Sequence, residues 1–155
     1  MNRRSAIACI AGIFILDRLT KIWAVKALAG GKEIKLLPFF GLTYAENTGA
    51  AFSMLQNGRF ILIAVSSALL WAMFHWRGEM ARSGRTAQWG LAFAAGGALG
   101  NLWDRVATGV VIDFLHLSHW PVFNVADSFI TCGAVMLGWA FAFGPASRAE
   151  GYAEK

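Results

Sequence analysis

Four long apolar segments constrain this chain more than any other feature. They cover residues 6–29, 60–76, 87–103 and 122–143. A helix rises about 1.5 Å per residue, so about 20 residues cross a hydrocarbon core about 30 Å thick. Each segment is long enough to span a membrane once its interfacial ends are included. We therefore expect an all-α membrane protein with four transmembrane helices, folded as a single integral-membrane domain over residues 1–155.

Composition argues against a soluble or nucleic-acid-binding protein. Hydrophobic residues make up 57% of the chain, charged residues make up 15%, and the mean hydropathy is +0.50. The net charge of +5 comes from basic residues that flank the apolar segments, with no basic stripe interleaved with exposed aromatics. We therefore expect no nucleic-acid partner. Cys9 and Cys132 lie inside apolar segments, which disfavours a disulfide or a metal site built on them.

The basic residues in short loops predict the orientation. They lie before the first segment, between the second and third, and after the fourth: Arg3, Arg4, Arg77, Arg82, Arg85, Arg148 and Lys155. Loops rich in Lys and Arg stay in the cytoplasm, so both termini should be cytoplasmic. Segment 31–59 then lies on the outer side, where turn residues around Pro38 and Gly41 separate β-leaning runs. We expect a small extracytoplasmic β-sheet there.

Polar residues inside the helices are expected to converge at one depth. Counted from the cytoplasmic flanks, Asp17 lies about 20 Å up and Asp127 about 24 Å up. Asn101 and Arg105 lie about 24 to 30 Å up. An ionisable side chain in this outer part of the membrane must face the bundle interior or water, which makes it a candidate functional residue.

Two aspartates suggest a chemistry for this layer. Asp113 and Asp127 would lie about 21 Å apart on one continuous helix, but the link "HLSHWP" lets the chain reverse between them. We expect the two side chains to meet where one helix ends and the next begins. Asn101 and Arg105 share one helix face, and Asn124 shares another with Asp127. Two close carboxylates tend to share a proton, so one can activate water while the other polarises a carbonyl. The pattern fits peptide hydrolysis by an aspartic mechanism.

Several alternatives remain open at this point. Buried aspartates also serve as proton relays, cation sites or packing ion pairs, so a small transporter and an assembly protein are both candidates. A transporter would continue its polar path toward the cytoplasm, where segments 60–70 and 91–99 offer only Ser66 and Ser67. A metallopeptidase would use Asp113 with two histidines of the link.

The metal alternative has a geometric difficulty. Asp113, His116 and His119 are of metal-ligand type, but a spacing of i, i+3, i+6 wraps too far round a helix to converge. The other charged residues also have structural interpretations. Asp17 and Lys21 are four residues apart, so one structural interpretation is an intrahelical ion pair. Arg105 either neutralises the aspartates or extends to the interface beside Asp104, which we expect to be interfacial.

Five short blocks of this sequence resemble a known family. They are "DRLTK" (17–21), "NTGAAFS" (47–53), "GNLWDR" (100–105), "GVVIDF" (109–114) and "FNVAD" (123–127). In this order, and in these segments, they are similar to the blocks of bacterial lipoprotein signal peptidase, also called signal peptidase II, an aspartic intramembrane protease family. The resemblance covers the chain from residue 17 to 127.

The resemblance implies an activity and a location. The activity is that of an aspartic endopeptidase that removes the signal peptide from diacylglyceryl-modified prolipoproteins, cutting on the N-terminal side of the lipidated Cys. The location is the bacterial cytoplasmic (inner) membrane, with several spans, cytoplasmic termini and an active site near the outer, periplasmic face. Its partners are then prolipoprotein substrates carrying a diacylglyceryl-Cys, and membrane lipid. The family uses no metal and no organic cofactor, and we expect a monomer.

The resemblance also implies roles for individual residues. Asp113 and Asp127 match the catalytic pair. The residues that match those positioning the dyad and the substrate are Asn47, Asn101, Arg105 and Asn124. Asp17 and Lys21 match a structural polar pair on the first helix.

Overall fold

The computed structural model describes residues 1–49 and 58–144. Its helices are α1 (Arg3–Leu28), α3 (Gly58–His75), α4 (Arg77–Arg82), α5 (Arg85–Ala107) and α6 (Val125–Phe143). Its strands are β1 (Glu33–Leu37), β2 (Phe40–Asn47) and β3 (Val111–Leu117). Residues 50–53 of the "NTGAAFS" block, and the basic residues Arg148 and Lys155, lie outside the described part of the chain.

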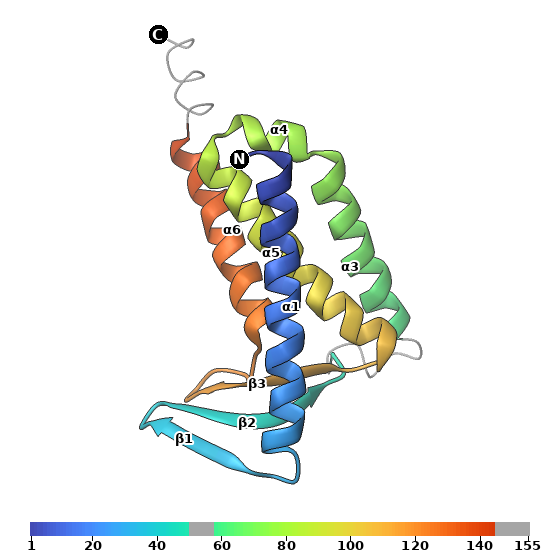
Figure 1. Ribbon diagram of the computed structural model, residues 1–155, viewed down its shortest axis with the longest axis vertical. Coiled ribbons are helices and arrows are strands. Elements are labelled where there is room, and N and C mark those ends of the chain that lie inside the picture. Colours follow the sequence, from blue (N-terminus) through green and yellow to red (C-terminus); the bar gives the residue numbers. More distant parts are fainter. Residues whose placement is uncertain (50–57, 145–155) are drawn as a thin grey trace.

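Four long helices run along one another, and a small sheet lies across one end of them (Figure 1). The four apolar segments of the sequence therefore correspond to α1, α3, α5 and α6. By length and hydropathy, two helices in the described residues are apolar enough to cross a membrane, namely α3 and α6. Helices α1 and α5 have a lower hydropathy because they carry most of the buried charged and polar side chains.

Helix α5 occupies the centre of the bundle and contacts α1, α3 and α6. Its approach to α6 depends on small residues. A Cβ atom added to Gly90 would lie 2.8 Å from the carbonyl oxygen of Gly133, and one added to Gly133 would lie 2.6 Å from the backbone nitrogen of Ala94. Small residues at such positions let two helix backbones pack closely in a membrane, where no hydrophobic driving force acts between helices.

Helix α3 packs far less tightly than the others. Gly58 is its one buried residue, and large apolar side chains along it are mostly exposed, including Phe60, Val65, Trp71 and Phe74. Such a continuous exposed apolar surface marks an interaction site or a membrane-facing surface.

The sheet differs from the sequence-based expectation. It is antiparallel with the order β1-β2-β3, so segment 31–59 supplies two strands and the third comes from residues 111–117. We expected Asp113 at a helix end, and that was wrong. Helix α5 stops at Ala107, and Gly109 with φ of 90° turns the chain into β3. Arg59 caps this helix end by donating from Nε and Nη2 to the carbonyls of Arg105 and Val106, at 2.9 and 2.8 Å.

The sheet is attached to the bundle through an apolar cluster at the end of α1. Ala24 and Leu28 of α1 pack against Phe114 of β3, all three buried. Trp23 adds an edge-to-face contact with the Phe114 ring, with centroids 6.3 Å apart. Because successive strand residues point to opposite faces, anchoring Phe114 in this cluster turns Asp113 the other way.

Candidate active site

Asp127 is fixed by the start of helix α6. Asn124 is the N-cap, and its side-chain oxygen accepts from the Asp127 backbone nitrogen at 2.9 Å. In return, Oδ2 of Asp127 accepts from the Asn124 backbone nitrogen at 3.2 Å. This reciprocal capping box satisfies two otherwise unpaired helix donors, and the helix dipole favours a carboxylate in the first turn. The carboxylate of Asp127 therefore has a defined position.

Asp113 lies on β3 with two amide donors around it. Its side chain is buried, with 2% of the residue exposed. Asn47 Nδ2 donates to Oδ2 at 2.9 Å, and Asn124 Nδ2 donates to Oδ1 at 2.6 Å. The sheet register pairs Ala45 with Asp113 and thereby brings Asn47, two residues along β2, to the diagonal position on the same face. Asn124 thus touches both carboxylates, one through its side chain and one through its backbone.

Asn101 links three helices at this level. Its Nδ2 donates to Oδ1 of Asp127 at 2.7 Å. Its side-chain oxygen accepts from Asn124 Nδ2 at 3.1 Å and from Lys21 Nζ at 2.9 Å. Helices α1, α5 and α6 are therefore joined by hydrogen bonds directly behind the two carboxylates.

Asp17 and Lys21 form a buried pair on α1. Lys21 Nζ lies 2.9 Å from Oδ2 of Asp17, and both side chains are almost completely buried. Oδ1 of Asp17 accepts from the Ala126 backbone nitrogen at 3.1 Å, one residue before Asp127. A Cβ added to Gly100 would lie 2.5 Å from Oδ2 of Asp17, so a glycine is needed for this carboxylate to fit against α5. The pair holds the first turn of α6 against α1.

Asp104 is buried inside the bundle. It is 1% exposed and lies 2.8 Å from Lys21 Nζ, and it also pairs with Arg18. Its Oδ2 accepts from the Ile112 backbone nitrogen at 3.4 Å, next to Asp113. Asp104 therefore connects α5 and α1 to the strand that carries one of the two aspartates.

Arg105 lies at the edge of the network. Its Nη1 donates to the Asn101 carbonyl at 3.4 Å, and its charge acts on Asp127 and Asp113. The charge of Arg105 also acts on Asp104. The Asp104 carboxylate accepts hydrogen bonds from Lys21 and Arg18, with none from Arg105, in the described structure.

The surroundings of Asp113 favour a shared proton. The pKa of Asp113 is raised to about 6, chiefly by burial and also by the charge of Asp127, while hydrogen bonds from Asn47 and Asn124 act in the opposite direction. The pKa is raised because the charged form loses hydration in the buried site and meets a second carboxylate nearby. One of the two carboxylates therefore holds a proton more readily than an ordinary aspartate does.

The charge balance of the network also favours one protonated aspartate. It contains three cationic and four acidic side chains: Arg18, Lys21, Arg105, Asp17, Asp104, Asp113 and Asp127. The cluster is neutral when one of its aspartates, such as Asp113, carries a proton. A neutral cluster costs less to bury than a charged one.

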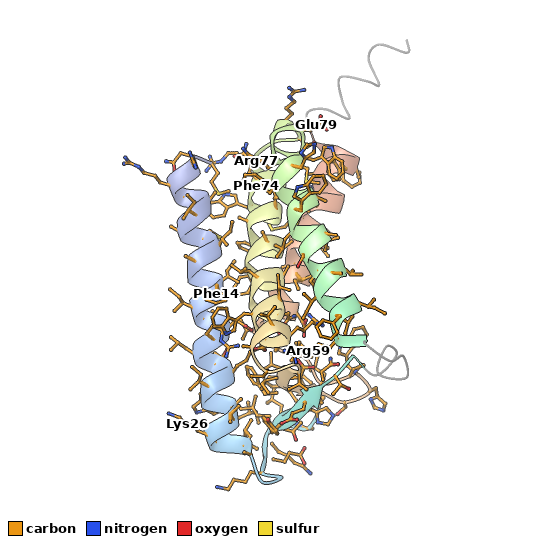
Figure 2. All side chains as sticks on the ribbon, turned by 90° about the vertical axis from the view of Figure 1, so that its right-hand side faces the viewer. Phe14, Lys26, Arg59, Phe74, Arg77 and Glu79 are labelled. Atoms are coloured by element: carbon orange, nitrogen blue, oxygen red, sulfur yellow. The ribbon has the colours of Figure 1, made fainter. Side chains whose placement is uncertain are left out.

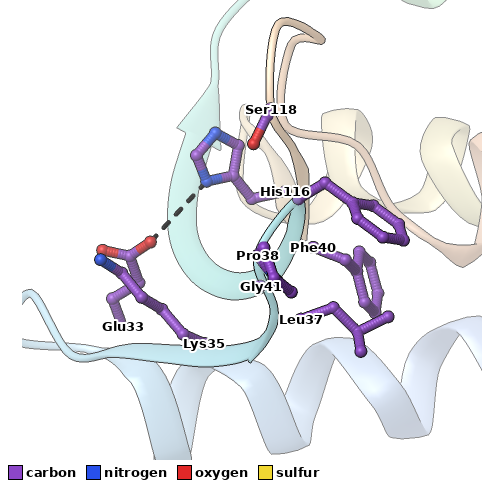
Figure 3. Close-up of a pocket in the computed structure, with 9 residues that line it drawn as sticks. Glu33, Lys35, Leu37, Pro38, Phe40, Gly41, His116 and Ser118 are labelled. Carbon is purple, nitrogen blue, oxygen red and sulfur yellow. Dashed lines mark ion pairs between the residues drawn. The ribbon is translucent and has the colours of Figure 1, made fainter.

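The histidines that suggested a metal site are directed elsewhere. His116 Nδ1 lies 3.9 Å from a carboxylate oxygen of Glu33, in a pocket of about 240 Å³ at the outer edge of the sheet (Figure 3). Asp113 and His116 are three residues apart on a strand, so they point to opposite faces. His119 follows in a turn with φ of 70°. No group of three potential metal ligands lies together within residues 1–49 and 58–144.

Comparison with known proteins identifies the family of this chain. The family model described as signal peptidase (SPase) II matches residues 9–143, which include every side chain of the network. The chain belongs to the signal peptidase II family.

Individual relatives extend over most of the chain. Lipoprotein signal peptidase of Thermodesulfovibrio yellowstonii is 44% identical over 134 residues, covering 80% of this chain and 85% of the relative. Lipoprotein signal peptidase of Caldanaerobacter subterraneus subsp. tengcongensis is 41% identical over 140 residues, covering 89% and 96%. A solved bacterial membrane enzyme, determined at 1.9 Å by the in meso method, superposes with a TM-score of 0.84 at 28% identity, covering 90% of this chain and 93% of that one.

The structure brings together all the residues that the sequence assigned to the signal peptidase II site. It adds two more, Asp104 and Arg18. The sequence contained a signal for Asp104, because it lies three residues after Asn101 and so shares a helix face with it. Arg18 had no such signal, since it neighbours Asp17 in sequence but reaches α5 only through tertiary packing.

Proposed function

We propose that this chain is a four-span intramembrane aspartic endopeptidase in which Asp113 and Asp127 form the catalytic dyad. Membership of the signal peptidase II family means that it removes signal peptides from prolipoproteins. The finer proposal is that it acts on the diacylglyceryl-modified precursor and cuts on the N-terminal side of the lipidated Cys. Asn47, Asn101, Arg105 and Asn124 position the dyad and the substrate.

The main support for this proposal is that one asparagine, Asn124, hydrogen-bonds to both carboxylates. Asn124 donates to Asp113 from its side chain and to Asp127 from its backbone. A carboxyl pair held in this way, with the pKa of one member raised to about 6, matches the requirement for one acid and one base in the same site.

The mechanism follows from where the proton resides. The raised pKa of Asp113 favours the proton on that carboxyl, which then donates a hydrogen bond to the scissile carbonyl oxygen. Ionised Asp127 takes a proton from water as the water oxygen bonds to the carbonyl carbon, giving a tetrahedral intermediate. Asp127 returns this proton to the departing amide nitrogen as the C–N bond breaks. The carboxylic acid of the signal peptide and the free amine of the Cys leave, and Asp113 retains its proton.

Neighbouring side chains support the charges that develop. Asn47 and Asn124 hold Asp113 in one orientation. Asn101 holds Asp127 through its amide, and Lys21 fixes the orientation of Asn101. The positive charge of Arg105 lies near both aspartates and offsets the negative charge of the tetrahedral intermediate.

The proposed topology places both termini in the cytoplasm. The basic residues of the α3–α5 connection lie at the same end as the N-terminus, and Figure 2 shows Arg77 and Glu79 there, with Lys26 and Arg59 at the other end. The positive-inside rule supports the first end as cytoplasmic. The sheet and the dyad then lie near the periplasmic face. Exposed apolar side chains on α3 and α6 support contact of these helices with lipid.

The proposed substrate suits this position. A diacylglyceryl group partitions into lipid with about 0.8 kcal/mol for each buried CH₂, so the modified Cys is held at the outer membrane surface before it meets the protein. Strand β1 and the turn after it expose Ile34, Leu36, Leu37 and Phe39 on the same side. These exposed apolar residues support contact of this end of the sheet with the membrane. We propose that this protein acts as a monomer.

The structure disfavours the proton-relay alternative. A relay needs polar groups that continue toward the cytoplasmic end. Below the network, Ile13 of α1 is 5% exposed and packs on Gly96 of α5, and the neighbouring buried positions of α5 are Ala92 and Ala94. These apolar contacts interrupt any polar path through the described part of the bundle.

The proposal is tested by a gel-shift cleavage assay in detergent or lipid. Purified protein is given a prolipoprotein with the diacylglyceryl modification and, as control, the same precursor without it, each with and without EDTA. We expect cleavage of the modified precursor alone, unaffected by EDTA. Equal cleavage of both precursors would contradict the proposed substrate, and loss of activity in EDTA would favour a metallopeptidase.

A further inference from the structure

A second concave site lies at the opposite end of the bundle from the dyad. Helices α1 and α3 both contact α5, and between them runs a groove of about 650 Å³. Its walls are apolar and include Ile10 of α1, Leu70 and Phe74 of α3, and Leu91 and Leu99 of α5. The volume falls within the range of about 300–1,000 Å³ typical of small-molecule sites. The groove is therefore large enough for an elongated apolar ligand.

The mouth of this groove is positively charged. Arg3 of α1, Arg77 of α4 and the N-terminal amine of Met1 line it, and among residues 1–49 and 58–144 no carboxylate does. The Arg77 guanidinium is held by a 2.6 Å hydrogen bond to the Phe74 carbonyl and lies 4.1 Å from the centroid of the Phe74 ring. In Figure 2, Phe74 and Arg77 lie together at the end of the bundle where α1 begins. Both arginines are exposed, and neither pairs with a carboxylate in the described structure.

From this combination we propose that the groove binds an anionic phospholipid of the cytoplasmic leaflet. Its phosphate lies between Arg3 and Arg77, and an acyl chain follows Ile10 and Leu91 toward Leu99. Basic pockets between transmembrane helices on the cytoplasmic side are suited to anionic headgroups. The inference rests on the proposed membrane orientation, and it concerns a site that takes no part in peptide cleavage.

Charge distinguishes this ligand from the other apolar candidate, the signal peptide itself. Signal peptides carry a positively charged segment at their cytoplasmic end. That segment would meet Arg3, Arg77 and the N-terminal amine at the groove mouth, where like charges repel. An anionic phosphate is attracted by the same groups.

A bound lipid would supply contacts that α3 lacks. Apart from its first residue, α3 has no buried position among those described, and α5 and the short α4 are the elements it chiefly contacts. An acyl chain between α1 and α3 would bury Leu70 and Phe74 and join the two helices across the groove. Anionic lipid should therefore stabilise the folded protein as well as bind it.

The test measures lipid binding by native mass spectrometry of detergent-purified protein. Wild type is titrated with phosphatidylglycerol and, separately, with phosphatidylcholine. The variant is Arg3→Gln/Arg77→Gln. The matched control is Arg82→Gln/Arg85→Gln, which removes the same charge at the same end from residues that do not line the groove. A second variant, Ala95→Phe, fills the groove and leaves the charge unchanged.

We expect wild type to prefer phosphatidylglycerol. The first variant should bind it about thirtyfold more weakly, from about a fivefold loss for each arginine, and the control should change by less than about threefold. Ala95→Phe should bind less of both lipids. Equal affinity of wild type and Arg3→Gln/Arg77→Gln would overturn the proposal, as would equal affinity for the two lipids. Displacement of phosphatidylglycerol by a synthetic signal peptide would also overturn it, in favour of a peptide site.

This outcome is separable from that of the proposed function. Both double variants should cleave modified prolipoprotein in detergent at the wild-type rate, which also shows that they are folded. Failure of wild type to cleave would contradict the peptidase proposal without changing the binding result.

Discussion

Asn124 provides the sharpest test of how the dyad is held, because it performs two separable tasks. Its side-chain oxygen caps α6 by accepting from Asp127, and its Nδ2 donates to Asp113 at 2.6 Å and to Asn101 at 3.1 Å. Asn124→Asp keeps the capping oxygen and removes the donor. Asn124→Ala removes both. The two variants therefore separate helix capping from dyad positioning.

The structure sets the expected magnitudes. Loss of an N-cap costs about 1 kcal/mol, so Asn124→Ala should be destabilised by at least that amount relative to Asn124→Asp. Leaving a buried polar group without its hydrogen-bond partner costs about 1–3 kcal/mol, so loss of the donor to Asp113 should lower kcat/KM by about 5- to 150-fold in both variants. In Asn124→Asp the new carboxylate should also raise the pKa of Asp113 above its value of about 6.

The assay combines thermal unfolding in detergent with the kinetics of prolipoprotein cleavage between pH 5 and 9. We expect greatly reduced activity in both variants. Near pH 5, where protonation lowers the cost of burying the new carboxyl, Asn124→Asp should unfold at a higher temperature than Asn124→Ala. If Asn124→Asp retained kcat/KM within about twofold of wild type, the bridging role of this side chain would be refuted. Equal loss of stability in the two variants would refute the capping argument.

Three further perturbations test other contacts of the network. Asn47→Ala removes a donor that stabilises ionised Asp113, so the pKa of Asp113 should rise. The alkaline limb of the kcat/KM profile should then move to higher pH, and a limb that stays in place or moves to lower pH would contradict this. Gly100→Ala places a methyl group against a buried carboxylate and should lower the free energy of unfolding by about 1–3 kcal/mol in chemical denaturation. In the control Gly138→Ala the new methyl group meets nothing within 4 Å, so this variant should be as stable as wild type or more stable. Asp104→Asn removes the negative charge that pairs with Lys21 and Arg18, so it should lower kcat with little change in KM. A change in KM alone would show that Asp104 acts on substrate binding instead.

The helices could be predicted from the sequence because their signal is local. Four apolar stretches of helical length correspond to α1, α3, α5 and α6, with ends that differ by a few residues. The clustering of the site was also predictable, because buried polar groups in a membrane protein must find one another. Depth counted along each helix brings Asp17, Asn101 and Asp127 to one level, and in the structure a chain of hydrogen bonds joins them.

Strand β3 could not be predicted in the same way. The run "VIDFLHL" is apolar on both sides, with a burial pattern that is continuous over its first four residues, so it lacks the alternation that marks an exposed strand. Its conformation depends on pairing with β2, which is far away in sequence. The burial of Asp104 likewise depends on Arg18 and Lys21 reaching it from another helix. Both features belong to tertiary packing, which composition and spacing do not encode.

The central claim is that Asp113 and Asp127 together perform the hydrolysis. It is tested most directly by Asp113→Asn and Asp127→Asn, assayed for cleavage of diacylglyceryl-modified prolipoprotein beside wild type, with thermal unfolding to confirm that each variant is folded. Removing a general acid or base typically costs about 10²- to 10⁴-fold in rate, so each variant should lose at least about a hundredfold in kcat. A folded variant of either aspartate that cleaves within about tenfold of the wild-type rate would contradict the account.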